Sequence, residues 1–222
     1  MLKEQIKMLL QFIIAFYDIY SGDNRIGENS LTFFRTLSLY RELRWIQSCI
    51  EQDAYHQAIR ELRFILDSII QAYYVDKMHP DSEMSCKLEI VKEIENWRYG
   101  TRLIEETDLG HKEDLKRLYK ELSEYVHSSY KEPDSSRPKT AKKIAHLKFE
   151  RDSEMINLCV RASNQCIDVV FFVAISLFPQ IFGLQTKREK MKRSFIDSLK
   201  KFQCEMTLDK LKAISGFLPT KK

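Results

Sequence analysis

The stretch from Ile167 to Leu184, IDVVFFVAISLFPQIFGL, is the most apolar segment of the chain, and its interpretation decides the fold. A helix that spans a membrane needs about 20 consecutive apolar residues, and this run is interrupted by Asp168 and Ser176. Pro179 and Gly183 stand near its end, where helices stop. We therefore expect the most deeply buried helix of a soluble bundle, and no membrane partner.

The rest of the chain extends this helical pattern in both directions. Only six Gly and five Pro occur in 222 residues, which favours long helices with few turns over a sheet protein. Apolar residues recur at helical spacing in most segments between loop signals, and no repeat of 20 to 50 residues is present. The sequence predicts an all-α fold, an up-and-down helical bundle. We expect helices at about 2–20, 31–50, 53–77, 82–97, 112–129, 151–182, 187–202 and 208–214, with Ser30 capping the second, Asp53 the third, and Ser82 or Ser85 the fourth.

The last part of the chain differs in composition from what precedes it. We expect residues 1–186 to form the bundle and residues 187–222 to form a basic helical appendage, packed as an extension of the same domain. The segment 187–201 reads KREKMKRSFIDSLKK, in which basic residues outnumber acidic ones. It is either a solvated helix face or a surface that binds phosphates. The candidate binding residues are Lys187, Arg188, Lys190, Lys192 and Arg193.

Charge and cysteine content exclude several classes of protein. The net charge of +4 permits contact with nucleic acid without arguing for it. The five cysteines are odd in number and form no CxxC pair, which is typical of reduced thiols in the cytoplasm. No P-loop, GxGxxG, GxSxG or HExxH motif occurs, so we expect no cofactor and no metal ion.

The third predicted helix contains three charged residues on one side. Arg63 and Asp67 are four residues apart and can form an ion pair, and Arg60 lies one turn before Arg63. Apolar residues surround the pair almost completely, so we expect it to face the interior or another helix, where a charge needs a partner. It is either an internal polar anchor or part of a functional site.

The fifth predicted helix ends with a stripe of polar and aromatic residues. Tyr119, Ser123, His127 and Tyr130 are spaced by four, four and three residues, so they share one face. His127 is the best candidate for a general base, because its ordinary pKa lies near neutrality. The alternative is a structural histidine that complements the negative end of the helix dipole.

Two segments together resemble a known family. The segment Leu62–Asp67 followed by Tyr73–Tyr74, and the later segment Tyr119–His127, resemble the helical HEPN-like superfamily, in particular its branch among prokaryotic defence proteins. The resemblance covers about residues 53–182. It implies a helical bundle that often forms homodimers, with members that act as metal-independent ribonucleases in toxin–antitoxin or abortive-infection systems.

The sequence departs from the catalytic signature of that family. The signature has four to six residues between an Arg and the His, and the matching positions here are Leu122, Glu121 and Lys120, none of which is Arg. His127 matches directly, and Tyr130 matches a tyrosine of some members. A cation for the reacting phosphate would have to come from Lys120, Arg60, Arg63 or a dimer partner.

Two functions are therefore expected from the sequence, with a helical sensor of a small ligand as a third. The first is a HEPN-like module with little or no catalysis that binds RNA or a cognate protein, in which Arg63, Ser123 and His127 form a polar network that fixes the bundle. The second is a metal-independent endoribonuclease that uses His127 with an Arg or Lys. The missing Arg favours the binding module.

Overall fold

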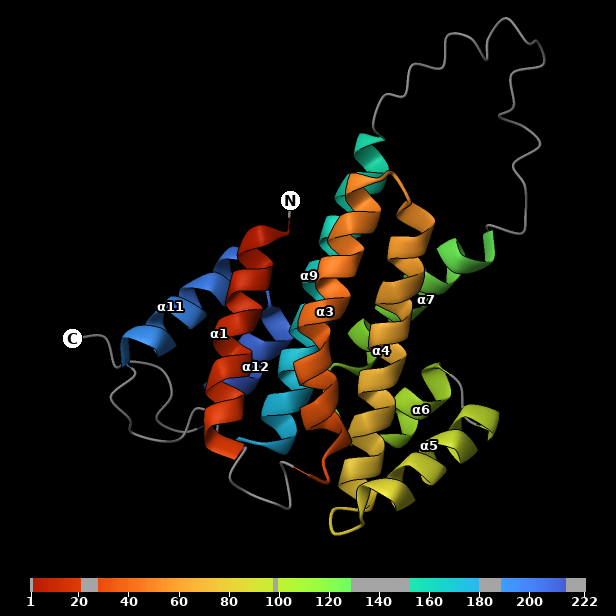
Figure 1. Ribbon diagram of the computed structural model, residues 1–222, viewed down its shortest axis with the longest axis vertical. Coiled ribbons are helices and arrows are strands. Elements are labelled where there is room, and N and C mark those ends of the chain that lie inside the picture. Colours follow the sequence, from red (N-terminus) through yellow and green to blue (C-terminus); the bar gives the residue numbers. More distant parts are fainter. Residues whose placement is uncertain (1, 21–27, 98–99, 129–151, 180–188, 215–222) are drawn as a thin grey trace, which may run out of the picture.

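The computed structural model is an all-α helical bundle, as the sequence predicts. It describes residues 2–20, 28–97, 100–128, 152–179 and 189–214. The helices of these residues are α1 (Lys3–Tyr20), α3 (Leu31–Glu51), α4 (Tyr55–Met78), α5 (Met84–Trp97), α6 (Thr101–Glu106), α7 (Lys112–Ser128), α9 (Ser153–Leu177), α11 (Glu189–Lys201) and α12 (Glu205–Ala213). Figure 1 shows α3 and α4 side by side, with α1, α11 and α12 to one side and α5, α6 and α7 to the other.

The centre of the bundle is α9. Every residue from Cys166 to Ile175 is buried, and α9 contacts α3, α4, α7 and α12. By length and composition α9 could cross a membrane, but most of its apolar part is enclosed by the other helices. It ends at Leu177, before the expected end at residue 182, because Pro179 disfavours helical backbone at the residue preceding it. Residues 180–184 lie outside the described part.

A cluster of phenylalanines fixes α11, the basic helix, to the bundle. The ring centroid of Phe195 lies 5.7 Å from that of Phe12 in α1 and 5.3 Å from that of Phe171 in α9. Ile196 and Leu199 are buried beside Phe195. This face of α11 therefore packs into the same core as α1 and α9, whereas Arg193, Lys200 and Lys201 of the same helix are exposed.

The caps of α3 and α4 test two local predictions. Ser30 caps α3 as expected, since its Oγ accepts a hydrogen bond from the backbone N–H of Phe33 at 3.1 Å. The prediction that Asp53 caps α4 is wrong. Asp53 has left-handed backbone (φ 59°) where the chain leaves α3, and its carboxylate accepts from the hydroxyl of Tyr55 at 2.6 Å. Ala54 occupies the cap position without a side-chain hydrogen bond.

The N-terminal cap of α5 also differs from the prediction. The helix begins at Met84, and the side-chain oxygen of Asn29 accepts from the backbone N–H of Met84 at 3.1 Å. This cap comes from a residue distant in the sequence, whereas we expected Ser82 or Ser85. The short helix α6, between Gly100 and Thr107, was not expected.

A buried ion pair joins α3, α4 and the start of α5. Asp76 of α4 accepts from the hydroxyl of Ser30 and the backbone N–H of Thr32, both at 2.8 Å. Lys87 donates to Asp76 at 2.8 Å and to the backbone oxygen of Asn29 at 2.6 Å. We refer to these four residues and Asn29 as the Asp76 network. It stabilises the N-terminus of α3, whose first N–H groups lack partners within the helix.

A second buried carboxylate serves α12 in the same way. Asp168 of α9 accepts from the backbone N–H groups of Met206 and Thr207 at 3.0 and 2.9 Å. Burial raises the pKa of Asp168, and its hydrogen bonds with Thr207 oppose that shift. Each of these two aspartates therefore caps a helix that is remote in sequence.

Candidate functional site

Arg63, Asp67 and Ser123 meet where α4 packs on α7, and we call them with Tyr119 the Arg63 cluster. The Nε of Arg63 donates to the hydroxyl of Ser123 at 2.9 Å, and its Nη1 forms an ion pair with Asp67. Ser123 in turn donates to the backbone oxygen of Tyr119 at 2.7 Å. The expected ion pair is confirmed, and it faces another helix as predicted.

The ring of Tyr119 forms one side of this cluster. The guanidinium carbon of Arg63 lies 3.4 Å from the ring centroid, a cation–π contact. On its other side the ring lies against Gly100, where an added Cβ would stand 2.2 Å from the Tyr119 ring. Gly100 also has left-handed backbone (φ 63°), which glycine adopts without strain. Gly100 thus leaves the space in which Tyr119 covers Arg63.

Partial burial shapes the electrostatics of the cluster. The side chains of Arg63 and Asp67 are 15% and 28% exposed. Burial raises the pKa of the Asp67 carboxyl to about 7 and lowers the pKa of the Arg63 guanidinium to about 10. Removal from water disfavours both charges, and the contact between them offsets part of that cost. The pair lies within α4, and Arg63 joins α4 to α7 through its contacts with Ser123 and Tyr119.

Beside the cluster, α6 and α7 enclose a shallow hollow of about 470 Å³ that Tyr119 and Ser123 help to line. Its cations have acidic partners close by. Lys116 pairs with Glu105 and Glu113, and Lys120 lies 3.9 Å from Glu124. Lys120, one of the expected substitutes for the missing arginine, is thus an exposed residue with an acidic neighbour, outside the Arg63 cluster.

The remaining predicted catalytic residues are placed only in part. Tyr130 and the side chain of His127 lie outside the described part of the structure. The backbone of His127 belongs to the last turn of α7, one turn beyond Ser123. Tyr73 bonds Asp108 before α7, and Arg63 bonds Ser123 within it, so α4 and α7 are antiparallel. Residue 127 therefore lies toward the end of α4 that holds Arg60, which is exposed.

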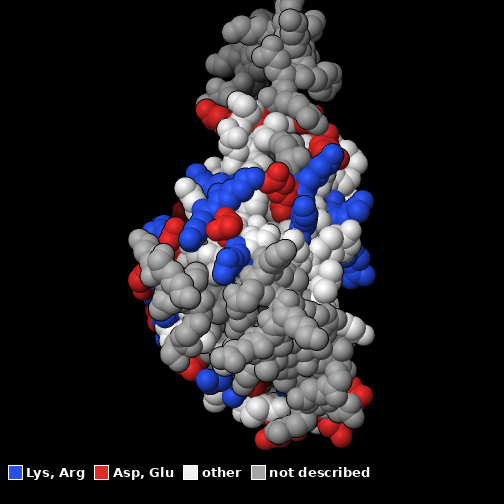
Figure 2. All heavy atoms as spheres, turned by 90° about the vertical axis from the view of Figure 1, so that its left-hand side faces the viewer, with Lys and Arg blue, Asp and Glu red and all other residues white. Residues whose placement is uncertain are grey.

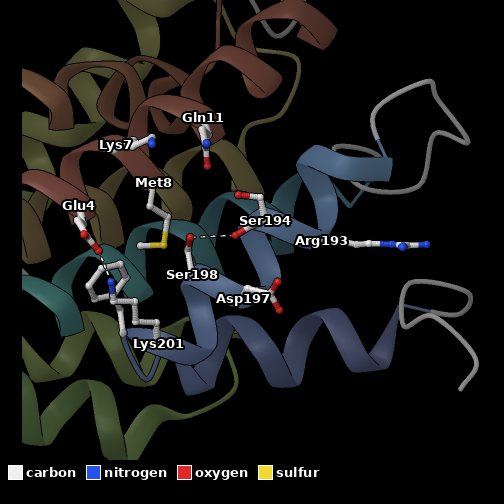
Figure 3. A pocket seen from close by; sticks show the side chains of 10 residues that line it. Glu4, Lys7, Met8, Gln11, Arg193, Ser194, Asp197, Ser198 and Lys201 are labelled. Atoms are coloured by element: carbon white, nitrogen blue, oxygen red, sulfur yellow. Dashed lines mark hydrogen bonds and ion pairs between the residues drawn. The ribbon is translucent and has the colours of Figure 1, made fainter.

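A second hollow, of about 590 Å³, lies between α1 and α11 (Figure 3). Lys7 and Gln11 extend into it from α1, and Ser194 and Ser198 line it from α11, while Arg193 extends outward at the rim. We call this the α1–α11 hollow. Ammonium, amide and hydroxyl donors on one concave surface are suited to an anion.

Acidic side chains reduce the positive charge of the α1–α11 hollow without cancelling it. Lys201 forms an ion pair with Glu4, and Asp197 is a further acidic lining residue. Lys7, Arg193 and Lys201 supply three cations against these two carboxylates. Figure 2 shows the surrounding face, where Lys and Arg side chains gather in its upper half with acidic side chains between them.

The structure describes only part of the predicted basic binding segment. Arg193, one of the predicted binding residues, lines the α1–α11 hollow. Lys187 and Arg188 lie outside the described part, as do the side chains of Lys190 and Lys192, whose backbone belongs to α11. Among the described residues, no group of three or more His, Cys, Asp or Glu side chains could hold a metal ion.

Sequence reasoning missed the contribution of α1 to the basic surface and the role of Gly100. Lys7 and Gln11 lie far from residue 193 in sequence, and only the packing of Phe12 against Phe195 brings them together. The helical spacing of Lys7 and Gln11 could have indicated a shared polar face. No sequence signal identified its partner helix.

No protein-family model, curated protein or solved structure matches this chain. The resemblance to HEPN-like proteins therefore rests on the quoted segments alone, and it stays a prediction.

Proposed function

We propose that the chain is a HEPN-like helical module that binds RNA without cleaving it, or cleaves it only weakly. The resemblance implies a role in prokaryotic defence or a toxin–antitoxin pair, in the cytoplasm. The observation that carries the binding proposal is the α1–α11 hollow, which joins Lys7, Arg193 and Lys201 from two distant segments. Lysine and arginine side chains bind phosphates without reading the base sequence.

The Arg63 cluster supports weak or absent catalysis. An arginine that stabilises a reacting phosphate must present its donors to the phosphate oxygens. In this protein Nε of Arg63 is bonded to Ser123, Nη1 to Asp67, and one guanidinium face is covered by Tyr119. Arg63 is therefore engaged in joining α4 to α7, and Lys120 lies beside Glu124.

One observation favours the alternative, a metal-independent endoribonuclease. The antiparallel packing of α4 and α7 brings the backbone of His127 toward the end of α4 that carries Arg60. Arg60 is exposed, and its distance from Arg63 is one helical turn. In this alternative His127 is the general base or acid and Arg60 the cation that stabilises the phosphorane.

The test of binding is fluorescence anisotropy with a 5′-labelled, mixed-sequence RNA oligonucleotide at several salt concentrations. Lys7→Gln and Arg193→Gln should each weaken binding several-fold, and each should lower the salt dependence of log K by about 0.7. Lys92→Gln, which removes an exposed lysine of α5, is the matched control and should leave the affinity unchanged. If neither Lys7→Gln nor Arg193→Gln changed the affinity for RNA, the proposed surface would be contradicted.

A further inference from the structure

An apolar groove lies between α3 and α5, on a face separate from the α1–α11 hollow. The groove measures about 510 Å³, and its apolar lining comes from Leu31, Phe34, Met84 and Leu88. Phe34 is 44% exposed and Leu88 is 46% exposed. Phe34 and Leu88 thus leave apolar surface open to solvent at the groove, where an apolar side chain of another molecule can be buried.

Exposed aromatic residues extend this groove along α3 and α4. The guanidinium of Arg35, at the rim, lies 5.5 Å from the ring centroid of Phe64 in α4, and Phe64 is 48% exposed. Trp45 is 51% exposed and stands eleven residues, about three turns, after Phe34 on the same face of α3. We call the groove with Phe64 and Trp45 the α3–α4 surface.

Arginine, not lysine, provides the positive charge of this surface. Arg41, Arg44 and Arg60 are exposed on α3 and α4, and Arg35 is half-buried. Their guanidinium groups are more weakly hydrated than ammonium groups and bind carboxylates through two parallel hydrogen bonds. Protein interfaces are enriched in arginine and aromatic residues and depleted in lysine, which is the composition found here.

The acidic residues of the two helices offset this charge only in part. Glu42 accepts from the hydroxyl of Ser38 at 3.1 Å, and burial raises its pKa. Glu61 accepts from the side chain of Gln57 at 2.6 Å. Glu28 lies at the rim of the groove. Arg41, Arg44 and Arg60 are exposed, whereas Glu42 and Glu61 are half-buried and only Glu51 is an exposed carboxylate of α3 or α4. Exposed arginines therefore outnumber exposed carboxylates on these two helices.

We propose that the α3–α4 surface docks an acidic, amphipathic segment of a partner protein. Apolar side chains of that segment occupy the groove beside Phe34 and Leu88, and its carboxylates pair with Arg35, Arg41 or Arg60. A second copy of this chain fits less well, because a two-fold axis would bring the same arginines against one another. This inference concerns a different surface from the RNA site and does not depend on it.

The test uses a synthetic helical peptide with leucines at i, i+3, i+4 and i+7 and glutamates elsewhere. Its matched partner has lysine in place of every glutamate. The glutamate peptide should bind the wild-type protein at least tenfold more tightly than the lysine peptide in calorimetry. Phe34→Ala and Arg35→Gln should each weaken binding of the glutamate peptide about tenfold.

Control variants separate the two surfaces. Ile14→Ala removes an exposed apolar residue of α1, and Lys7→Gln removes a cation of the α1–α11 hollow, so neither should change peptide binding. Circular dichroism checks that each variant is folded. Equal affinity for both peptides overturns the proposal. So does loss of RNA binding in Phe34→Ala, or concentration-dependent dimerisation that Phe34→Ala abolishes.

Discussion

Two polar networks hold helices together in this protein, and they differ in their access to solvent. In the Asp76 network, the side chains of Asp76 and Lys87 are 3% and 2% exposed. In the Arg63 cluster, the side chains of Arg63 and Asp67 are 15% and 28% exposed. Both contain an ion pair, yet only the second is open to the surface, beside the α6–α7 hollow.

This difference in exposure determines which of the two networks a ligand could reach. Each oxygen of Asp76 accepts hydrogen bonds from the start of α3, and Lys87 also bonds the backbone oxygen of Asn29, so both buried charges are paired within the protein. A charge pair this deeply buried is out of reach of a ligand in solution, and its role in this structure is to join helices. The Arg63 cluster keeps partial access to solvent, and its geometry therefore decides whether this end of α7 can perform chemistry.

The largest effect is expected from breaking the sealed network. Asp76→Ala leaves Lys87 buried without its carboxylate and the N-terminus of α3 without its acceptor, so unfolding in urea should show a loss of about 3–5 kcal/mol. The double substitution Asp76→Asn with Lys87→Met removes both charges and should recover much of that loss. Glu89→Ala breaks an exposed pair with Lys92 and should change stability by less than about 1 kcal/mol. Equal losses in Asp76→Ala and Glu89→Ala would refute the distinction.

A smaller loss is expected in the Arg63 cluster. Arg63→Ala removes the bonds to Asp67 and Ser123 and the contact with Tyr119, so the free energy of unfolding should fall by about 2–3 kcal/mol. Arg63→Lys should recover only part, since an ammonium group cannot reproduce the planar fork of donors. Arg60→Ala, one turn away and exposed, should stay within about 0.5 kcal/mol of wild type. A full recovery by lysine would show that charge alone matters.

The support of Tyr119 by Gly100 gives a third prediction. Gly100→Ala places a Cβ into the Tyr119 ring and strains left-handed backbone, so a loss of about 1–2 kcal/mol is expected in thermal or urea unfolding. Gly110→Ala is the matched control, because its Cβ would meet only Phe172 at an ordinary 3.9 Å. If Gly100→Ala and Gly110→Ala lowered the free energy of unfolding equally, the close packing of Tyr119 against Gly100 would be contradicted.

The smallest effect concerns pH. Burial raises the pKa of Asp67 from 3.8 to about 7, so the folded protein binds more protons than the unfolded chain between these values. The contribution of Asp67 to stability is therefore present below about pH 4 and is lost as the pH rises through 7. Relative to Asp67→Asn, wild-type stability should fall by about 1 kcal/mol from pH 4 to 7, since contact with Arg63 opposes the full shift. If the stability of wild type relative to Asp67→Asn instead rose from pH 4 to 7, the Asp67 carboxylate would be ionised in the folded protein over this range.

Local signals predicted most of the helices. The cap of α3 at Ser30 and the Arg63–Asp67 pair involve residues three or four apart, so helical geometry alone specifies them. Asp53 failed as a cap because its residue type suits both a cap and left-handed backbone, and only the turn between α3 and α4 decides between them.

Contacts between distant segments could not be predicted in this way. Asn29 caps α5, Asp76 caps α3 and Asp168 caps α12, and each acts across at least 38 positions of sequence. Nothing in the spacing of a single helix identifies its partner helix. The α1–α11 hollow and the α3–α4 surface likewise arise from packing, so the sequence predicted only the part that Arg193 contributes.

The most direct test of the account follows one labelled RNA in EDTA with wild type, Lys7→Gln and a folded His127→Ala variant, measuring binding and chain cleavage in the same samples. The account predicts that wild type and His127→Ala bind equally and leave the RNA intact, while Lys7→Gln binds several-fold more weakly. Efficient cleavage by wild type that disappears in His127→Ala would contradict it and establish a metal-independent ribonuclease.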